Sequence, residues 1–301
     1  MTGVFPIAPT PFHDDESIDL DGQARVIEFL IDAGVDGICI LANYSEQFAL
    51  TDDERQRLQT TILRQVDGRV PVIVTTSHYT TRIAADRSRR AQDEGASMVM
   101  LMPPYHGATL RIAESQITDY FRTIADQIEI PIMIQDAPMS GTPLSADILA
   151  ALAREIPSVQ YVKVESANAA AKLKRLIDLA GDSLPGPFDG EESVTLIPDL
   201  EAGATGTMPS SAIPEVLGEI VRDWLVGDRE KATSTWESWL PMIHYENRQC
   251  NLRGTKILMR EGGIIGSART RDPFGSLPPE IAAGYIAHAR RRDPLVLRWA
   301  R

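Results

Sequence analysis

Short apolar runs alternate with longer amphipathic segments along the first 225 residues, and this order strongly limits the fold. Eight runs have the composition and flanks of β-strands, at residues 4–8, 37–41, 70–75, 98–102, 130–135, 159–165, 186–189 and 203–208. The segments between them, such as 24–33, place apolar residues three and four apart, as amphipathic helices do. Thr51-Asp52-Asp53-Glu54 is a capping box, and Ser145 precedes a further helix. Eight such β-then-α units predict an α/β protein with a (β/α)8 TIM barrel.

An open doubly wound sheet is the alternative fold, and it predicts a glycine-rich phosphate-binding turn after the first strand. The first strand is instead followed by Pro9-Thr10-Pro11-Phe12, which argues against a nucleotide site. After about Gly227 no further strand is indicated, and the sequence predicts helices at 229–245, 252–261 and 279–291. We therefore expect a barrel over residues 1–226 and a C-terminal helical extension over residues 227–301.

The composition excludes several classes of function. The formal net charge of −12 argues against binding to nucleic acid or to anionic membranes, because both require a basic face. Two cysteines, Cys39 and Cys250, are too few for a disulfide framework, and the five histidines show no paired spacing of metal ligands. We therefore expect no metal. The sequence shows neither a signal peptide nor an apolar run long enough for a membrane span, which predicts a cytoplasmic protein.

Lys163 is the first lysine of the chain, and it lies inside a run of β-branched and aromatic residues, Val159-Gln160-Tyr161-Val162-Lys163-Val164-Glu165. Lysine is rarely buried without a reason, and burial lowers the pKa of an amine and makes it nucleophilic. One interpretation is a lysine that forms a Schiff base. The other is a strand-end lysine that reaches solvent or pairs with Glu165.

The expected active site lies where the barrel strands end. Lys163 is near the end of the sixth strand, and Glu165 faces the same side because side chains alternate along a strand. A carboxylate there could act as general acid and base, or only balance the charge of the lysine. Five other strands end in polar runs, which together predict a site for a small, hydroxylated, anionic substrate.

Several runs resemble the dihydrodipicolinate synthase / N-acetylneuraminate lyase superfamily of Schiff-base barrels. They occur in the family's order and spacing: Gly3-Val4-Phe5-Pro6-Ile7-Ala8-Pro9-Thr10-Pro11-Phe12, Ala33-Gly34-Val35-Asp36-Gly37, Leu50-Thr51-Asp52-Asp53-Glu54-Arg55, Met102-Pro103-Pro104-Tyr105 and the strand of Lys163. The resemblance implies a covalent imine on Lys163, no added cofactor, and assembly as a homotetramer or dimer of dimers.

The chain departs from the common family pattern at two places. Ala42-Asn43-Tyr44-Ser45-Glu46 stands where the family has Gly-Thr-Thr-Gly-Glu, and Gln135 stands where it has a catalytic tyrosine. These runs, together with Gly190-Glu191-Glu192, resemble the branch that dehydrates L-2-keto-3-deoxyarabonate to 2-oxoglutarate semialdehyde. A glutamine cannot relay a proton as a phenol does, so dehydration is expected rather than carbon–carbon cleavage.

The resemblance to this branch implies a role for each residue of the expected site. Lys163 forms the imine with a 2-keto-3-deoxy acid, and Glu165 moves the protons. The residues expected to bind substrate are Asn43, Tyr44 and Ser45 at the carboxylate, Gln135 at a hydroxyl or at Glu165, Tyr105 near a subunit interface, and Gly190. The alternatives are a pyruvate-dependent aldolase or lyase, a catalytically inactive keto-acid binding barrel, and a metal-dependent barrel.

Overall fold

The computed structural model describes residues 1–104 and 112–300. Contacts divide the chain into two compact units, the first formed by residues 1–2 and 71–208 and the second by residues 3–70 and 209–301. Neither unit ends at residue 226, and the expected division into a barrel and an extension there stays a prediction.

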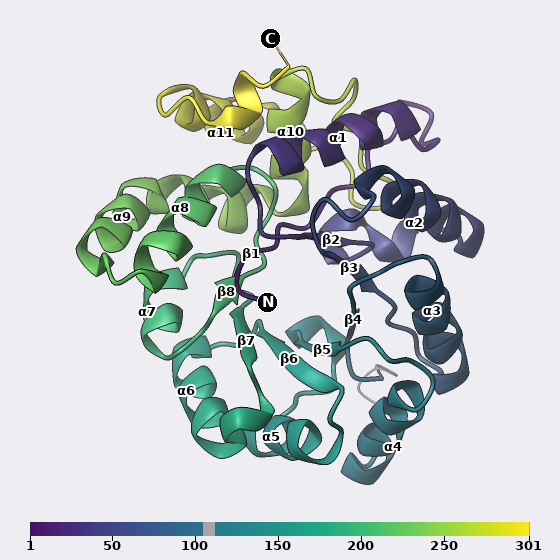
Figure 1. Cartoon of the computed structure of the whole chain (residues 1–301). Coiled ribbons are helices and arrows are strands. Elements are labelled where there is room, and N and C mark those ends of the chain that lie inside the picture. Colours follow the sequence, from purple (N-terminus) through teal and green to yellow (C-terminus); the bar gives the residue numbers. More distant parts are fainter. Residues whose placement is uncertain (105–111, 301) are drawn as a thin grey trace. The chain divides into compact units, whose positions relative to one another are not determined.

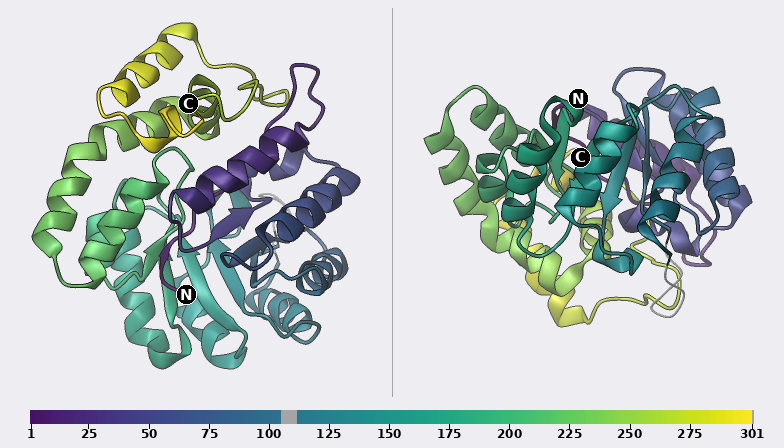
Figure 2. Two further views of the ribbon diagram at one scale, coloured as in Figure 1. Left: turned by 45° about the horizontal axis from the view of Figure 1, so that its top comes forward. Right: turned by 90° about the horizontal axis from the view of Figure 1, so that it is seen from below.

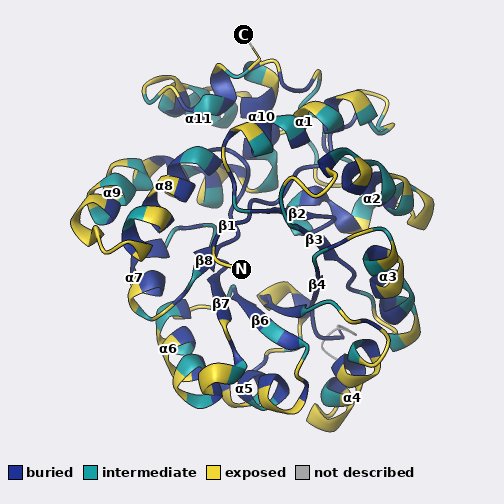
Figure 3. Cartoon of the chain, in the orientation of Figure 1, coloured by how far each residue is buried: buried dark blue, intermediate teal, exposed yellow. Residues whose placement is uncertain are grey.

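The first unit repeats strand and helix five times and ends on a sixth strand (Figure 1). Its elements are β3 (Val72–Thr75), α3 (Thr81–Asp93), β4 (Met98–Leu101), α4 (Glu114–Ala125), β5 (Ile132–Asp136), α5 (Ala146–Glu155), β6 (Val159–Val164), α6 (Ala169–Ala180), β7 (Gly186–Asp189), α7 (Leu196–Glu201) and β8 (Gly206–Thr207). All neighbouring strands of this unit pair in parallel. The strands are buried, whereas the helices carry exposed residues on their outer faces (Figure 3).

The second unit holds the first two strands and most of the C-terminal helices. Its elements are β1 (Gly3–Val4), α1 (Leu20–Asp32), β2 (Ile38–Ile40), α2 (Asp52–Val66), α8 (Pro214–Leu225), α9 (Arg229–Tyr245), α10 (Leu252–Glu261) and α11 (Pro279–Arg290). Helix α8 packs beside α9, and α10 packs beside α11 (Figure 2). The three predicted C-terminal helices are therefore confirmed to within one residue.

The strands form an eight-stranded sheet in the order β1-β8-β7-β6-β5-β4-β3-β2. The segments of β1 and β2, at the two ends of this order, are joined to each other. Cys39 N donates to Pro6 O over 2.9 Å, and Ala8 N donates to Cys39 O over 2.8 Å. A sheet whose end strands bond to each other is a closed barrel, so the predicted (β/α)8 barrel with C-terminal helices is confirmed.

Local sequence explains where the elements begin. Thr51 accepts from the backbone N of Glu54, whose carboxylate accepts from Thr51 N, so the predicted capping box opens α2. Ser145 caps α5 as predicted. Helix α1 begins earlier than the predicted residue 24, because the Asp19 carboxylate accepts from Gly22 N over 2.7 Å.

Seven of the eight predicted strands are longer than the observed ones, and the first and the last differ most. The prediction of residues 4–8 as a regular strand was wrong, since β1 covers Gly3–Val4 and the next residues reach their neighbours by isolated bridges at Ile7. Proline has no backbone N–H to donate, and Pro6 and Pro9 flank that bridge. The eighth strand is also shorter than predicted, at Gly206–Thr207.

Candidate active site

Lys163 is a buried amine near the end of β6, as the sequence predicted. Its side chain is 1% exposed, and the Nζ atom lies 2.7 Å from Oε1 of Glu165. In the sheet it is paired with Gln135 of β5 on one side and with Phe188 of β7 on the other. The amine and the carboxylate are therefore close enough to exchange a proton directly.

Glu165 and Gln135 form the polar surroundings of this amine. Gln135 is fully buried, and its Nε2 donates to Glu165 Oε1 over 2.8 Å. Its Oε1 is buried without a hydrogen-bond partner in the part of the chain that the structure describes. A buried carbonyl oxygen without a partner is costly, so this amide offers an acceptor to a donor that enters the site.

Gly190 follows β7 and packs against both charged side chains. A Cβ atom added to Gly190 would lie 2.6 Å from Cγ of Glu165 and 2.9 Å from Cγ of Lys163. It would also lie 2.8 Å from the carbonyl oxygen of Val164, which accepts from Gly190 N over 3.0 Å. The structure thus brings together four of the predicted site residues, Lys163, Glu165, Gln135 and Gly190.

Asp136, the last residue of β5, is held by an ion pair. Its carboxylate lies 2.5 Å from Nζ of Lys172 on α6. Burial raises the pKa of the Asp136 carboxyl, and Lys172 opposes this shift. Asp136 O also accepts from Glu165 N over 3.1 Å. Asp136 therefore fixes backbone beside the site through its own carbonyl.

A buried acidic cluster beside Gly190 was missed from the sequence. Asp189 is fully buried and accepts from Thr207 Oγ1 over 2.5 Å. Thr195 Oγ1 donates to Asp199 over 2.7 Å. Burial, and next the charge of Asp189, raise the pKa of Asp199 to about 8. The available signal was an aspartate at the end of the seventh strand, directly before Gly190.

The second unit contains the predicted carboxylate-binding turn, Asn43–Ser45, as the short 3-10 helix η1. Ser45 is 1% exposed, and its hydroxyl donates to Ala8 O over 2.7 Å and accepts from Ala42 N over 3.2 Å. Asn43 Oδ1 accepts from Gln47 Nε2 over 2.6 Å. The Ser45 hydroxyl thus stabilises the turn by bonding to the backbone at Ala8 and Ala42.

A buried ion pair between Glu46 and Lys256 follows this turn and was also missed. Both side chains are fully buried, and Nζ of Lys256 donates to Oε1 of Glu46 and, over 2.9 Å, to Arg269 O. Arg271 N donates to the second oxygen of Glu46 over 2.9 Å. Burial lowers the pKa of Lys256 to about 8, against the opposing charge of Glu46. The signal was Lys256 itself, a rare lysine on an amphipathic helix next to Ile257 and Leu258.

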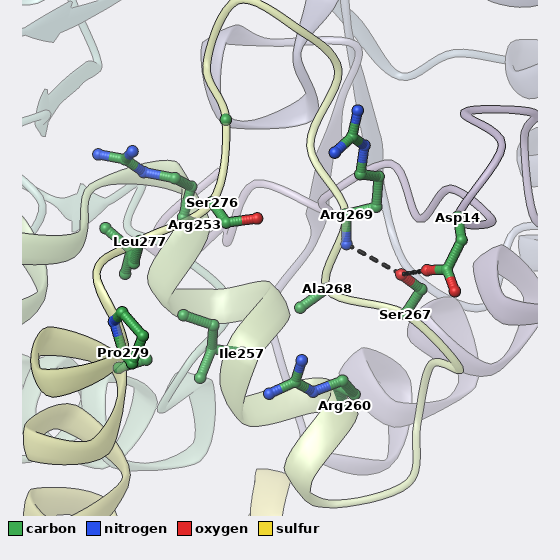
Figure 4. Close-up of a pocket in the computed structure, with 12 residues that line it drawn as sticks. Asp14, Arg253, Ile257, Arg260, Ser267, Ala268, Arg269, Ser276, Leu277 and Pro279 are labelled. Atoms are coloured by element: carbon green, nitrogen blue, oxygen red, sulfur yellow. Dashed lines mark hydrogen bonds between the residues drawn. The ribbon is translucent and has the colours of Figure 1, made fainter.

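Tyr105 and its neighbour His106 lie outside the described residues. A hollow of about 430 Å³ occurs in the second unit, and none of the predicted site residues lines it (Figure 4). Two of its arginines are engaged elsewhere, since Arg253 donates to Phe274 O over 3.1 Å and Arg269 donates to Glu16 over 2.5 Å. The residues that line the hollow thus include none of those predicted to act on substrate.

Within the described residues, 1–104 and 112–300, neither a cluster of metal ligands nor a membrane-spanning helix occurs. Histidine, cysteine, aspartate and glutamate form no group of three or more that could hold a metal ion there. Within the same residues, none of the helices has the length and apolar character required to cross a membrane. Cys39 and Cys250 are both buried as free thiols.

Comparison with known proteins defines the class of this chain. Residues 1–285 match the dihydrodipicolinate synthetase family, and the chain belongs to that family. It is 55% identical over 298 residues to an L-2-keto-3-deoxyarabonate dehydratase of Azospirillum brasilense, which covers 99% of this chain and 96% of the relative. It is also 30% identical to a 4-hydroxy-tetrahydrodipicolinate synthase of Haloarcula marismortui, over 96% of this chain and 91% of the relative.

Solved structures share the fold. The dihydrodipicolinate synthase of Aquifex aeolicus matches with a TM-score of 0.91 at 22% identity, covering 98% of this chain and 99% of that one. YagE, an E. coli K12 prophage protein of the same family solved in complex with pyruvate, matches with a TM-score of 0.88 at 25% identity, covering 98% of this chain and 99% of that one. The eight-stranded barrel with C-terminal helices is therefore the fold of this family.

Proposed function

We propose that this chain is a Schiff-base hydro-lyase that converts L-2-keto-3-deoxyarabonate to 2-oxoglutarate semialdehyde. The observation that carries the proposal is the 55% identity to a dehydratase of that substrate over 99% of this chain. The buried pair of Lys163 and Glu165 supports it, because an amine beside a carboxylate is the minimum that imine chemistry with proton transfer requires.

The reaction begins when neutral Lys163 Nζ attacks the C2 ketone of the substrate. The carbonyl oxygen leaves as water, and a protonated imine, an iminium, forms between Nζ and C2. This cation withdraws electrons from C3, so the C3 protons become acidic. Glu165 is the proposed base for one of them, since it already lies 2.7 Å from Nζ.

Loss of the C3 proton produces an enamine, whose electron pair expels the C4 hydroxyl. The proton that Glu165 has gained passes to this oxygen, which leaves as water. Loss of the hydroxyl leaves a C3–C4 double bond conjugated with the iminium, and C5 is still an alcohol. Removal of a C5 proton and protonation at C3 move the double bond to C4–C5. The resulting enol tautomerises to an aldehyde at C5, and hydrolysis of the imine frees Lys163. Lys163 acts as the electron sink throughout, so we propose that no added cofactor and no metal are needed.

The other predicted residues bind and orient the substrate. Gln135 orients Glu165 through Nε2, and its Oε1 accepts from a substrate hydroxyl. Gly190 leaves room for the side chains of Lys163 and Glu165, and we propose that the substrate lies beside it. We propose that Asn43 and Tyr44 hold the substrate carboxylate, and that Ser45 belongs to the same carboxylate-binding turn, whose shape its hydroxyl maintains. Tyr105 remains a proposed residue of a subunit interface.

We further propose a cytoplasmic homotetramer or dimer of dimers that acts on a small 2-keto-3-deoxy acid and on neither nucleic acid nor membranes. The net charge of −12 supports this set of partners.

The test is to incubate the purified protein with L-2-keto-3-deoxyarabonate and to identify the products by NMR. The proposal expects an aldehyde acid with the same five carbons and no pyruvate. Release of pyruvate would instead identify an aldolase or lyase. Binding of the substrate without turnover, by wild type and by Lys163→Ala alike, would identify an inactive barrel.

A further inference from the structure

Asp189 ends β7 and accepts hydrogen bonds from three groups, although its side chain is fully buried. Oδ1 accepts from Glu191 N over 3.0 Å. Oδ2 accepts from Ser193 N over 3.2 Å and from Thr207 Oγ1 over 2.5 Å. Hydrogen bonds to a carboxylate are about twice as strong as neutral ones. One carboxylate thus ties the end of β7 to the turn that follows it and to β8.

The turn that Asp189 holds has an unfavourable backbone conformation. Glu192 and Ser193 have φ angles of 52° and 65°, in the left-handed region that favours glycine. Each such residue costs on the order of 1–2 kcal/mol, so the surroundings must fix the turn. Ser193 receives this support twice, because its N donates to Asp189 and its hydroxyl lies 3.0 Å from Thr207 Oγ1.

The turn begins with Gly190, which is in contact with the candidate catalytic pair. An added Cβ at Gly190 would lie within 3 Å of both Glu165 and Lys163, so these side chains occupy the space over the glycine backbone. A shift of that backbone would release the glutamate carboxylate from its place beside Nζ. The position of Gly190 is therefore coupled to the geometry of the amine and the base.

We propose that Asp189 is a positioning residue of the active site, which holds Gly190 against Lys163 and Glu165 through its bonds to Thr207 and to the backbone of the turn. This inference rests on the proposed Schiff-base function. Asp199 lies beside this group, and burial together with the charge of Asp189 raises the pKa of Asp199 to about 8.

The experiment compares three variants of two threonines on one segment. Thr207→Val removes the hydroxyl that bonds Asp189, Thr207→Ser retains a hydroxyl, and Thr205→Val is the matched control. Thr205 Oγ1 reaches only the backbone oxygen of Pro187, at 3.5 Å. The readout is the exchange of pyruvate methyl protons for deuterium in D₂O, which requires both the imine on Lys163 and the base, but not the sugar acid.

We expect Thr207→Val to slow this exchange by about 10- to 100-fold, because displacement of a reacting group by about 1 Å can cost about 100-fold. The exchange rate of Thr207→Ser should stay within about threefold of the wild-type rate. Thr205→Val should exchange at the wild-type rate. Borohydride trapping of pyruvate on Lys163 should change less than exchange in every variant. A variant that still traps pyruvate but exchanges its protons slowly has a misplaced base. A variant that loses both trapping and exchange has lost the amine or is unfolded.

The inference is overturned if Thr207→Val exchanges at the wild-type rate, or if Thr207→Ser is slowed as much as Thr207→Val. Asp189→Asn provides a second test with the same measurement of pyruvate proton exchange, and its folding is checked by thermal melting. If wild type exchanges pyruvate protons but does not dehydrate the sugar acid, the substrate proposal fails while the role of Asp189 is still decided by the variants. A wild-type protein that forms no imine overturns both.

Discussion

The amine of Lys163 lies 2.7 Å from the carboxylate of Glu165, two residues further along the same chain segment. The two groups have unequal access to water, because 1% of the lysine side chain and 16% of the glutamate side chain are exposed. The proposed base is thus more exposed to solvent than the proposed nucleophile.

Replacement of Lys163 by arginine keeps the positive charge and removes the nucleophile. We expect Lys163→Arg to form no adduct with pyruvate after borohydride reduction, because a guanidinium stays protonated at all accessible pH values. Lys172→Arg is the matched control, since Lys172 forms an ion pair with Asp136 in the same unit. Intact-mass and peptide-mass analysis should show one adduct in this control. An adduct that persists in Lys163→Arg would show that another amine reacts.

Glu165→Gln should separate imine formation from proton transfer. The amide keeps the shape of the carboxylate but cannot take a proton, so pyruvate exchange and dehydration should fall by about 100- to 10,000-fold. Borohydride trapping on Lys163 should persist, because Lys163 remains in place. Asp178→Asn is a control, since this exposed carboxylate forms an ion pair with Lys174 on the surface of α6. Exchange at the wild-type rate in Glu165→Gln would assign the base to another group.

Gly190→Ala adds one methyl group where none fits. The new Cβ would lie 2.6 Å from Glu165 Cγ and 2.8 Å from the backbone oxygen of Val164, and the backbone cannot move away as a side chain can. We expect turnover to fall by about 100-fold through displacement of the base. Gly266→Ala is the control, because an added Cβ there meets no described atom within 4 Å. Steady-state kinetics of both variants with the sugar acid provide the measurement.

The raised pKa of Glu246 predicts how the free energy of unfolding depends on pH. It is fully buried and accepts from Ser210 Oγ over 2.8 Å and from Thr255 Oγ1 over 3.0 Å. Burial raises the pKa of Glu246 from its ordinary value of 4.5 to about 7, against these hydrogen bonds. Between those values the folded state binds more protons than the unfolded state. The free energy of unfolding contributed by this group therefore falls as the pH rises from 4.5 to 7.

Glu246→Gln removes this titration while keeping an oxygen that accepts hydrogen bonds. The variant should gain stability relative to wild type between pH 5 and pH 8, by up to about 3 kcal/mol, since one pKa unit corresponds to about 1.4 kcal/mol. Urea unfolding at several pH values measures the difference. Glu237→Gln, on the exposed face of α9, should follow wild type. A constant difference between Glu246→Gln and wild type across this range would contradict the prediction.

The buried pair of Lys256 and Glu46 predicts a large effect on stability. Lys256→Met leaves the Glu46 carboxylate buried and without its cation, which costs about 3–5 kcal/mol. Lys174→Met is the matched control, because the pair of Lys174 and Asp178 is exposed and contributes at most about 1 kcal/mol. The double variant Lys256→Met, Glu46→Gln should recover part of the loss. Equal losses in Lys256→Met and Lys174→Met would contradict this account.

The repeating pattern of the sequence predicted the barrel, because strands with a period of two and helices with a period of 3.6 are local properties. It also placed Lys163 and Glu165 on one side of a strand. The strand at residues 4–8 was predicted too long, because the pattern of apolar residues does not show that Pro6 and Pro9 lack N–H groups.

Contacts between distant residues could not be predicted in the same way. The partner of Asp136, Lys172, is 36 residues away on the next helix but one. The bond of Asp189 to Thr207 spans 18 residues, and that of Glu46 to Lys256 spans 210. Each depends on how helices and strands pack, which no short stretch of sequence specifies.

The scarcity of lysine has a chemical consequence for the surface of the molecule. The five lysines are outnumbered by arginines, and each of the other four is held beside a carboxylate, at Asp136, Asp178, Glu46 or the pair Glu219 and Asp223. Aldehydes condense with free amines far more readily than with guanidinium groups, which stay protonated. The proposed reaction releases an aldehyde at every turnover, and a surface with so few amines presents few targets for damage by that product.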